Sequence, residues 1–349
     1  NESLEAIREY ENEAAVSVLK PQNAVQCLVQ LAIAYNNISN QPKAVALLDK
    51  AVKIAGSDPG SRHLLGNIYV AYARVYRKLN EFSLARTQAE KALGYFREYG
   101  SWRGMAETYR EIASAYHQSG NSEKSIENYN LGIKIIGERK APFLLGKIYS
   151  DMSGAYWFLR RPQEGIKCLE KSIEYFDQTE HRIQSIAAYN NLGINLMLLG
   201  EWEKAERVIC TALDLAYEAD HVHVAGILDS LGELKLLRFE FEEAEKLLTE
   251  SIRFAAERKK EWYMIQSMRN LARCLLAQGR VAEAAKNAFE TIEVCRRIRE
   301  KQVANMARLV LAESYLKQGR IEESEKTLGE IEDTDPSSDF FVLGDIQRL

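Results

Sequence analysis

The segment Leu192-Gly193-Ile194-Asn195-Leu196 decides the fold, together with the small residues that follow it at Gly200, Ala205 and Ala212. The same arrangement returns along the chain at steps of about 40 residues. A small side chain stands at the place of Gly193 in each copy: Ala32, Ala73, Ala113, Ser153, Gly193, Gly232, Ala272 and Ala312. A second one follows twelve residues later: Ala44, Ala85, Ser125, Gly165, Ala205, Ala244, Ala284 and Ser324. Antiparallel helices approach closely only where their facing positions lack bulk, so the pattern predicts eight helical hairpins.

Bulky residues accompany each first small residue at offsets that share one helical face. Apolar or tyrosine side chains prevail one and four residues before it and three residues after it. Offsets of three, four and seven residues place side chains on the same face of a helix. The 17 tyrosines are therefore mostly assigned to packing between helices.

Turns inside the hairpins are predicted at matching places, where Gly or Asn can adopt the left-handed conformation that ends a helix. These places are Ser39-Asn40, Asn80, Ser119-Gly120, Arg161-Pro162, Gly200, Phe239-Glu240, Gly279 and Gly319. Pro42 and Pro162 suit the first turn of the second helix. Polar turns between hairpins are predicted at residues 56–61, 98–101, 137–141, 177–181, 218–221, 258–261 and 298–301.

Composition narrows the class of protein. The 349 residues carry a net charge of −4 with acids and bases interspersed, which gives no electrostatic reason to expect nucleic acid or an anionic membrane as a partner. No apolar run approaches the roughly 18–20 residues of a membrane helix, and no signal peptide opens the chain. The five cysteines have neither a disulfide nor a zinc spacing. We expect a cytoplasmic protein without membrane insertion or direct nucleic-acid binding.

The small residues, the aromatic residue four before them and the tyrosine three after them resemble the tetratricopeptide repeat (TPR). The step is 40 residues here and about 34 in that repeat, and the proline that closes its second helix is absent. The longer form is similar to repeats of kinesin light chain and Pins-type scaffolds, and of Rap-type and MalT-like bacterial regulators. Residues 190–193 look most like the first two groups, and residues 316–320 like the bacterial regulators. The resemblance implies an all-α, right-handed α-solenoid.

The repeat predicts three segments. Residues 21–332 form eight repeats, residues 1–20 the second helix of a preceding half-repeat, and residues 333–349 a loop followed by either a ninth repeat or a capping helix. The tetrad Leu343-Gly344-Asp345-Ile346 echoes Leu65-Gly66-Asn67-Ile68, which opens a first helix. Because the chain starts at Asn1, and because a ninth repeat would leave its end inside a hairpin, we expect a larger protein with room for an attached output domain.

First helices line the inner surface of such an array. Four rows of positions on them are left for binding: three and two residues before the first small residue, and one and four residues after it. One group is basic and belongs to repeats two and three: Arg74, Arg77, Arg110 and His117. Guanidinium groups can bind a carboxylate or a phosphate through two parallel hydrogen bonds. The alternative is that these arginines are solvated or paired with Glu107 and Glu111.

A second group follows in repeats five to seven: Asn190, Asn191, Asp229, Glu233, Arg269, Asn270 and Arg273. Asparagine has little reason to stand inside a helix unless its amide is used, so we expect these asparagines and arginines to hydrogen-bond an extended peptide. The resemblance implies the same role for Asn before a Leu-Gly pair. In a third group, Trp157 with Phe158 and Met197 forms either an apolar floor for a ligand side chain or a stack against the neighbouring hairpin.

Catalytic motifs are missing from the sequence. His221-x-His223 with Asp220 is its one metal-like cluster, on a turn where histidines two apart point differently unless extended. There is no Gly-rich phosphate loop, nucleophile elbow or H-E-x-x-H. We therefore expect no metal, no cofactor and no enzymatic activity.

Two hypotheses of function remain open. In the first, the array is a module whose concave groove binds a peptide or protein segment. In the second, it is the sensor region of a bacterial-type transcriptional or signalling regulator, and a ligand or partner changes the superhelix.

Overall fold

The computed structural model describes residues 19–179 and 183–331. The predicted half-repeat at 1–20, apart from its last two residues, and the predicted terminal segment at 333–349 lie outside these ranges. Within them the chain forms sixteen α-helices, one 3₁₀ helix and no strand, which confirms the all-α prediction. The chain divides into two compact units, residues 1–160 and 161–349.

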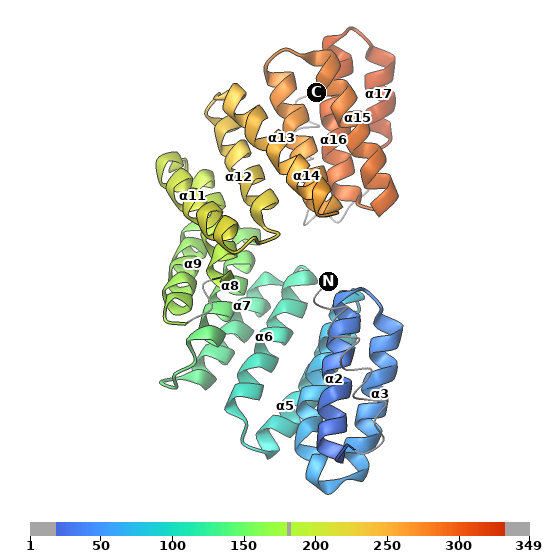
Figure 1. Ribbon diagram of the computed structural model, residues 1–349, viewed down its shortest axis with the longest axis vertical. Coiled ribbons are helices and arrows are strands. Elements are labelled where there is room, and N and C mark those ends of the chain that lie inside the picture. Colours follow the sequence, from blue (N-terminus) through green and yellow to red (C-terminus); the bar gives the residue numbers. More distant parts are fainter. Residues whose placement is uncertain (1–18, 180–182, 332–349) are drawn as a thin grey trace. The chain divides into compact units, whose positions relative to one another are not determined.

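The first unit is a stack of antiparallel helices in which α2, α4 and α6 each pair with the second helix that follows (Figure 1). Its helices are α2 (Pro21–Asn37), α3 (Gln41–Ser57), η1 (Pro59–Leu64), α4 (Leu65–Lys78), α5 (Phe82–Glu98), α6 (Trp102–Gln118), α7 (Ser122–Ile136) and α8 (Pro142–Phe158). The 3₁₀ helix η1 begins inside the turn predicted at 56–61 and leads directly into α4.

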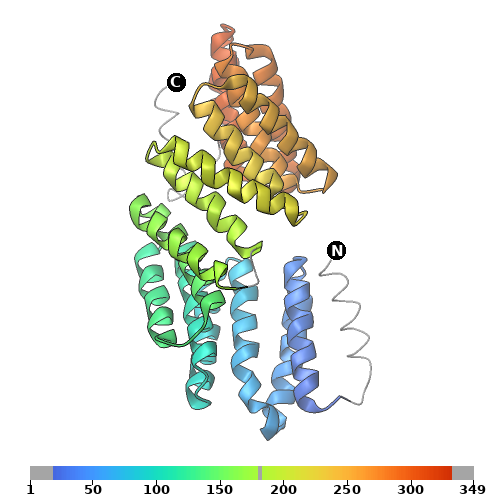
Figure 2. The ribbon, with the colours of Figure 1, turned by 60° about the vertical axis from the view of Figure 1, so that its left-hand side comes forward.

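The second unit continues the same pattern from α9 onward, and Figure 2 shows its successive hairpins. Its helices are α9 (Pro162–Asp177), α10 (Ile183–Leu198), α11 (Trp202–Glu218), α12 (Val224–Leu237), α13 (Phe241–Glu257), α14 (Glu261–Ala277), α15 (Val281–Ile298), α16 (Lys301–Lys317) and α17 (Ile321–Gly329). In both units, successive first helices also contact one another.

All sixteen small residues of the sequence pattern are buried. In α10, a β-carbon added to Gly193 would overlap the side chain of Ile209 in α11 and lie 3.3 Å from the carbonyl oxygen of Ala205. The hydroxyl of Ser324 donates a hydrogen bond of 2.8 Å to the carbonyl oxygen of Ala312, twelve residues earlier. The two small positions of a repeat therefore meet where its helices cross, as the sequence predicts.

Each hairpin turns at a residue with positive φ, seven positions after the first small residue. These residues are Ser39, Asn80, Gly120, Arg160, Gly200, Phe239, Gly279 and Gly319. Prediction and structure agree at the glycines and at Asn80. In repeats one and four the left-handed residue precedes the predicted Asn40 and Arg161. In repeat one, the backbone N–H of Asn40 donates to the carbonyl oxygen of Tyr35 at 2.9 Å. In such a helix end the left-handed residue is the one before the donor, which is Ser39.

The tight crossing predicts that Gly193→Ala destabilises the protein. The methyl group would have to displace Ile209 and crowd a carbonyl oxygen, and overpacking typically costs about 1–3 kcal/mol of unfolding free energy. The measurement is urea-induced unfolding followed by circular dichroism.

Gly94→Ala is the matched control, because a β-carbon on Gly94, in the middle of α5, meets nothing within 4 Å. There the exchange should stabilise the helix by about 0.5–1 kcal/mol. Equal changes in both variants would contradict the role assigned to the crossing.

Candidate functional site

The candidate binding residues lie on first helices, at their contacts with the next first helix. In the first unit, α4, α6 and α8 bring together five charged side chains, here called the arginine cluster: Arg74, Arg77, Arg110, Glu111 and Asp151. The arginines were predicted to converge, and they do so around one carboxylate. Glu111 is only 4% exposed.

Glu111 accepts hydrogen bonds from two arginines of the preceding repeat. Its Oε1 lies 2.8 Å from Arg74 Nε, and its Oε2 lies 3.4 Å from Arg77 Nη2. Arg110 Nη1 approaches Glu111 at 3.5 Å, while its Nε donates to Asp151 Oδ2 at 2.6 Å. The alternative of pairing with acidic residues is therefore realised for Glu111, and weakly for Glu107, at 4.0 Å from Arg74.

The charges of the arginine cluster shift the pKa values of its members. Burial raises the pKa of Glu111, but the adjacent Arg74, Arg110 and Arg77 outweigh it and hold that pKa below its usual range. Burial, Arg110 and Arg74 lower the pKa of Lys147. Counting Lys147, four cationic side chains face the carboxylates of Glu111, Asp151 and the more distant Glu107, so the face keeps an excess positive charge.

His117 and Trp157 flank the arginine cluster at the C-terminal ends of α6 and α8. The His117 ring meets the exposed ring of Phe158 edge to face, with centroids 4.8 Å apart. Burial lowers the pKa of His117, and Asp151 opposes this shift only in part. Phe158 thus lies beside His117, whereas Met197, the third member of the predicted apolar floor, belongs to α10 of the second unit.

In the second unit, α12 and α14 form a connected set of polar side chains, here called the polar ladder: Asp229, Glu233, Arg269, Asn270 and Arg273. Asn270 is its centre and is fully buried. Its Nδ2 donates to Asp229 Oδ1 at 3.0 Å, and its Oδ1 accepts from Arg269 Nη2 and Arg273 Nη1, each at 3.0 Å. Asn270 therefore holds the two guanidinium groups in position. Because it is fully buried, it cannot itself contact a ligand.

The two carboxyl groups of the polar ladder titrate in opposite directions. Burial raises the pKa of Asp229 to about 6, although Arg269 and Asn270 oppose the shift. Burial also raises the pKa of Glu233, but Arg273, whose Nη1 lies 2.9 Å from Glu233 Oε1, together with Arg269 brings it below its usual range. With both carboxyl groups ionised, two positive and two negative charges leave the polar ladder neutral.

Asn190 and Asn191 lie on α10, outside the polar ladder. Asn191 is exposed, whereas the Oδ1 of Asn190 is buried and has no hydrogen-bond partner in the described part of the chain. Arg269 Nε is likewise buried and unpartnered there, and its Nη1 lies 3.0 Å from Met306 Sδ. In the first unit, Asn36 Oδ1 and Arg77 Nε share this condition. All four positions belong to two predicted rows, three before and four after the small residue.

Glu111 and Asp151 both belong to the predicted row two residues before the small residue, but they were not predicted as site residues. The sequence contains a spacing that could have indicated them. Glu111 lies 37 positions after Arg74, and Asp151 lies 41 positions after Arg110, so each is about one repeat away from an arginine. Met306 lies outside the rows and gave no signal.

In the turn between α11 and α12 the two histidine side chains lie together, whereas the sequence predicted that they point in different directions. The rings of His221 and His223 meet edge to face with centroids 4.5 Å apart, because the tight turn folds them together. Asp220 Oδ1 instead accepts from Arg258 Nη2 at 2.5 Å. Among the residues that the structure describes, no three His, Cys, Asp or Glu side chains gather as metal ligands.

Two family models of tetratricopeptide repeats match the chain. A model of the MalT-like TPR region matches residues 159–348, more than half of the chain, and a tetratricopeptide-repeat model matches residues 106–138. The chain therefore belongs to the MalT-like TPR region family, and the predicted resemblance to TPR proteins is confirmed. No curated protein matches the sequence at a significant level.

Solved structures share the fold at low identity. The apo form of RapI matches with a TM-score of 0.63 and 14% identity, over 81% of this chain and 99% of RapI. A Rap protein complexed with Competence and Sporulation Factor matches with 0.62 and 14%, over 94% and 98%. A signal-transduction ATPase with a TPR sensor from Pyrococcus horikoshii matches with 0.66 and 14%, over 94% of this chain and about half (52%) of the ATPase. At such identities the likeness shows the fold alone.

None of the helices in the described ranges is both long and apolar enough to cross a membrane.

The geometry of Glu111 predicts that Glu111→Gln destabilises the first unit at pH 7. Removing its charge leaves three guanidinium groups facing one another, and breaking such a buried pair costs about 3–5 kcal/mol, less here because the arginines are partly exposed. Urea unfolding measures the loss. Glu107→Gln is the control: this residue is 44% exposed and only 4.0 Å from Arg74, so a change within about 1 kcal/mol is expected. Similar losses in both variants would refute the central role of Glu111.

The raised pKa of Asp229 predicts a stability that falls as pH rises. Between the unfolded value of 3.8 and the folded value of about 6, the native state binds more protons, so the free energy of unfolding decreases through that window. Asp229→Asn removes this dependence and should be more stable than wild type at pH 7.5, by up to about 3 kcal/mol. The difference should shrink towards pH 4.

Glu233→Gln provides a control of opposite sign, because the pKa of Glu233 is lowered by Arg273 and Arg269. This variant should be less stable than wild type at pH 7.5, with a deficit that disappears as the carboxyl protonates on acidification. Urea unfolding at several pH values distinguishes the two. A pH dependence of Asp229→Asn identical to that of wild type would exclude the proposed titration.

Proposed function

We propose that the chain is a protein-interaction module, and that the first-helix face of its second unit holds an extended segment of another polypeptide. The observation that supports this proposal is the placement of unpartnered polar atoms. In the second unit the predicted rows present Asn190 Oδ1, a hydrogen-bond acceptor, and Arg269 Nε, a donor.

Such atoms are costly unless something satisfies them. A buried polar atom without a partner costs about 1–3 kcal/mol of folding free energy, and each one in a native structure calls for an explanation. A polypeptide main chain supplies donors and acceptors in alternation. Both atoms are buried as the structure stands, but their side chains are partly exposed. When these side chains turn outward, a partner can satisfy the Asn190 amide through an N–H and the Arg269 guanidinium through a carbonyl.

The spacing of the helices suits an extended partner. Neighbouring packed helices lie about 8–10 Å apart, and an extended chain advances about 3.3–3.6 Å per residue. Each first helix thus meets every third residue of the partner, which allows one recurring contact per repeat. Because the polar ladder is neutral overall, it favours main-chain contacts over a strongly charged sequence.

The first unit offers an additional anchor of different chemistry. Its arginine cluster keeps an excess positive charge, and the Arg77 side chain is partly exposed. An acidic side chain or a terminal carboxylate is the group that guanidinium donors would hold bidentately. This proposal assigns no catalytic reaction, no cofactor and no nucleic-acid contact to the chain.

Membership of the MalT-like family supports a second candidate function, a sensor region within a larger regulator. The similarity in fold to part of the Pyrococcus horikoshii ATPase, which has a TPR sensor, agrees with it. The scaffold and the sensor differ in whether binding of a segment changes the conformation of the array. Small-angle scattering would show a changed radius of gyration on binding for a sensor and an unchanged one for a rigid scaffold.

Peptide binding is tested by selection from a random displayed peptide library, followed by fluorescence anisotropy with a selected peptide. Asn190→Ala and Arg269→Lys should each weaken binding about tenfold, since each removes about one hydrogen bond at the proposed face. Thermal unfolding verifies that both variants fold.

Asn287→Ala is the matched control. Its Oδ1 is also buried and unpartnered among the described residues, but it lies on α15, a second helix. Its affinity for the peptide should equal that of wild type. Failure to select any peptide, or an equal loss in the control variant, would overturn the proposed groove.

A further inference from the structure

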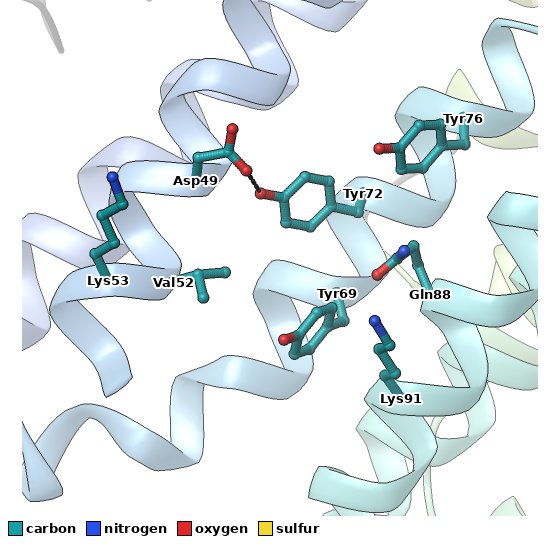
Figure 3. A pocket seen from close by; sticks show the side chains of 8 residues that line it. All are labelled: Asp49, Val52, Lys53, Tyr69, Tyr72, Tyr76, Gln88 and Lys91. Carbon is teal, nitrogen blue, oxygen red and sulfur yellow. Dashed lines mark hydrogen bonds between the residues drawn. The ribbon is translucent and has the colours of Figure 1, made fainter. Parts of the chain in front are cut away.

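A pocket of about 410 Å³ opens in the first unit, away from the first-helix face that carries the arginine cluster. Its walls come from α3 and α5, the second helices of two successive hairpins, and α4 forms the floor between them (Figure 3). Tyr69, Tyr72 and Tyr76 line the floor. Their spacing of three and four residues puts them on one side of α4, opposite to Arg74 and Arg77.

The floor arises from a departure of repeat two from the other repeats. Directly before the first small residue, the other seven repeats carry an aliphatic side chain or methionine, and repeat two carries Tyr72. The Tyr72 hydroxyl reaches across to α3 and donates a hydrogen bond to Asp49 (Figure 3). Burial and Asp49 raise the pKa of Tyr72 far above its ordinary value, which keeps the hydroxyl protonated.

The aromatic rings form a continuous surface. Tyr72 and Tyr76 are nearly parallel with centroids 6.2 Å apart, and Tyr69 stacks on Tyr95 at 5.6 Å. Such distances are those of offset-stacked rings. A further planar ring entering the pocket can therefore extend an arrangement that the tyrosines already make.

Two lysines stand on opposite walls, Lys53 on α3 and Lys91 on α5 (Figure 3). Both are exposed, and neither pairs with a carboxylate in the described part of the chain. Lys91 Nζ lies 5.6 Å from the centre of the Tyr69 ring. The charged residues of the lining are two lysines and one carboxylate, Asp49, which accepts the hydrogen bond from Tyr72. The pocket therefore has a net positive charge.

We propose that this pocket binds a small aromatic anion, a planar ring that carries a carboxylate or a phosphate. The ring lies against the tyrosine floor, and its anionic group lies between Lys53 and Lys91. A volume of about 410 Å³ falls at the small end of ligand pockets. The site uses neither the polar ladder nor the arginine cluster, so its failure would leave the proposed peptide groove untouched.

The test is ligand-observed NMR and calorimetric titration of the full chain with phenyl phosphate at low salt. A ligand of about ten non-hydrogen atoms is expected to bind with a dissociation constant on the order of 1 mM. Phenol, the ring without the anion, and inorganic phosphate, the anion without the ring, should each bind at least about tenfold more weakly. Binding of inorganic phosphate as tight as that of phenyl phosphate would overturn the proposal, as would the absence of any binding.

Two variants locate the ligand. The double variant Lys53→Gln/Lys91→Gln should weaken phenyl phosphate about tenfold. Tyr72→Leu, which introduces the side chain that repeats one and five carry at this position, should abolish the advantage of phenyl phosphate over inorganic phosphate.

The control is Lys50→Gln/Lys134→Gln, which removes the same charge. Lys50 lies on α3, about one helical turn before Lys53, and Lys134 lies on α7. Both of these lysines are exposed, and neither lines the pocket. Affinity for phenyl phosphate should stay at the wild-type value. Equal losses in the two double variants would show that only net charge matters and would refute the site.

Discussion

The close approach of two helices at paired small residues is the constraint on which the rest of this structure depends. Where Gly193 faces Ala205, a single added methyl group would collide with Ile209 and crowd a carbonyl oxygen. The small residues of all eight repeats are buried, and each hairpin turns seven residues after the first of them. Because the geometry of each hairpin is thereby fixed, neighbouring first helices meet at equivalent positions, and their polar residues are arrayed in rows.

Those rows are where the repeats differ from one another. In the first unit they collect arginines around the buried Glu111, and in the second they build a neutral network around the buried Asn270. Both networks hold long charged side chains in fixed positions, which reduces the entropy lost when a ligand binds. Both also leave polar atoms unsatisfied at neighbouring positions. The proposed recognition of a polypeptide segment depends on this preorganised face and its unmet hydrogen bonds.

The pocket between α3, α4 and α5 contains a side chain, Tyr72, at a position that serves packing between helices in the other repeats. Tyr72 occupies a place that the other repeats fill with aliphatic side chains or methionine, and its hydroxyl links α4 to Asp49 of the preceding hairpin. Tyr72 lines the pocket between two second helices, and Ala73 at the adjacent crossing remains buried. A repeat array tolerates such local change because each hairpin contacts only its neighbours.

The sequence by itself determined the fold class, the boundaries of the hairpins and the rows that hold the candidate site, because a tight helix crossing permits only small side chains and so leaves a readable period. It also indicated that Arg74, Arg77 and Arg110 converge. It did not determine which row members reach solvent. Asn270, Glu111 and Asn191 occupy one row, yet the first two are buried and the third is exposed. That outcome depends on how closely neighbouring first helices pack and on which long side chain finds a partner one repeat away, and only the tertiary structure decides these contacts.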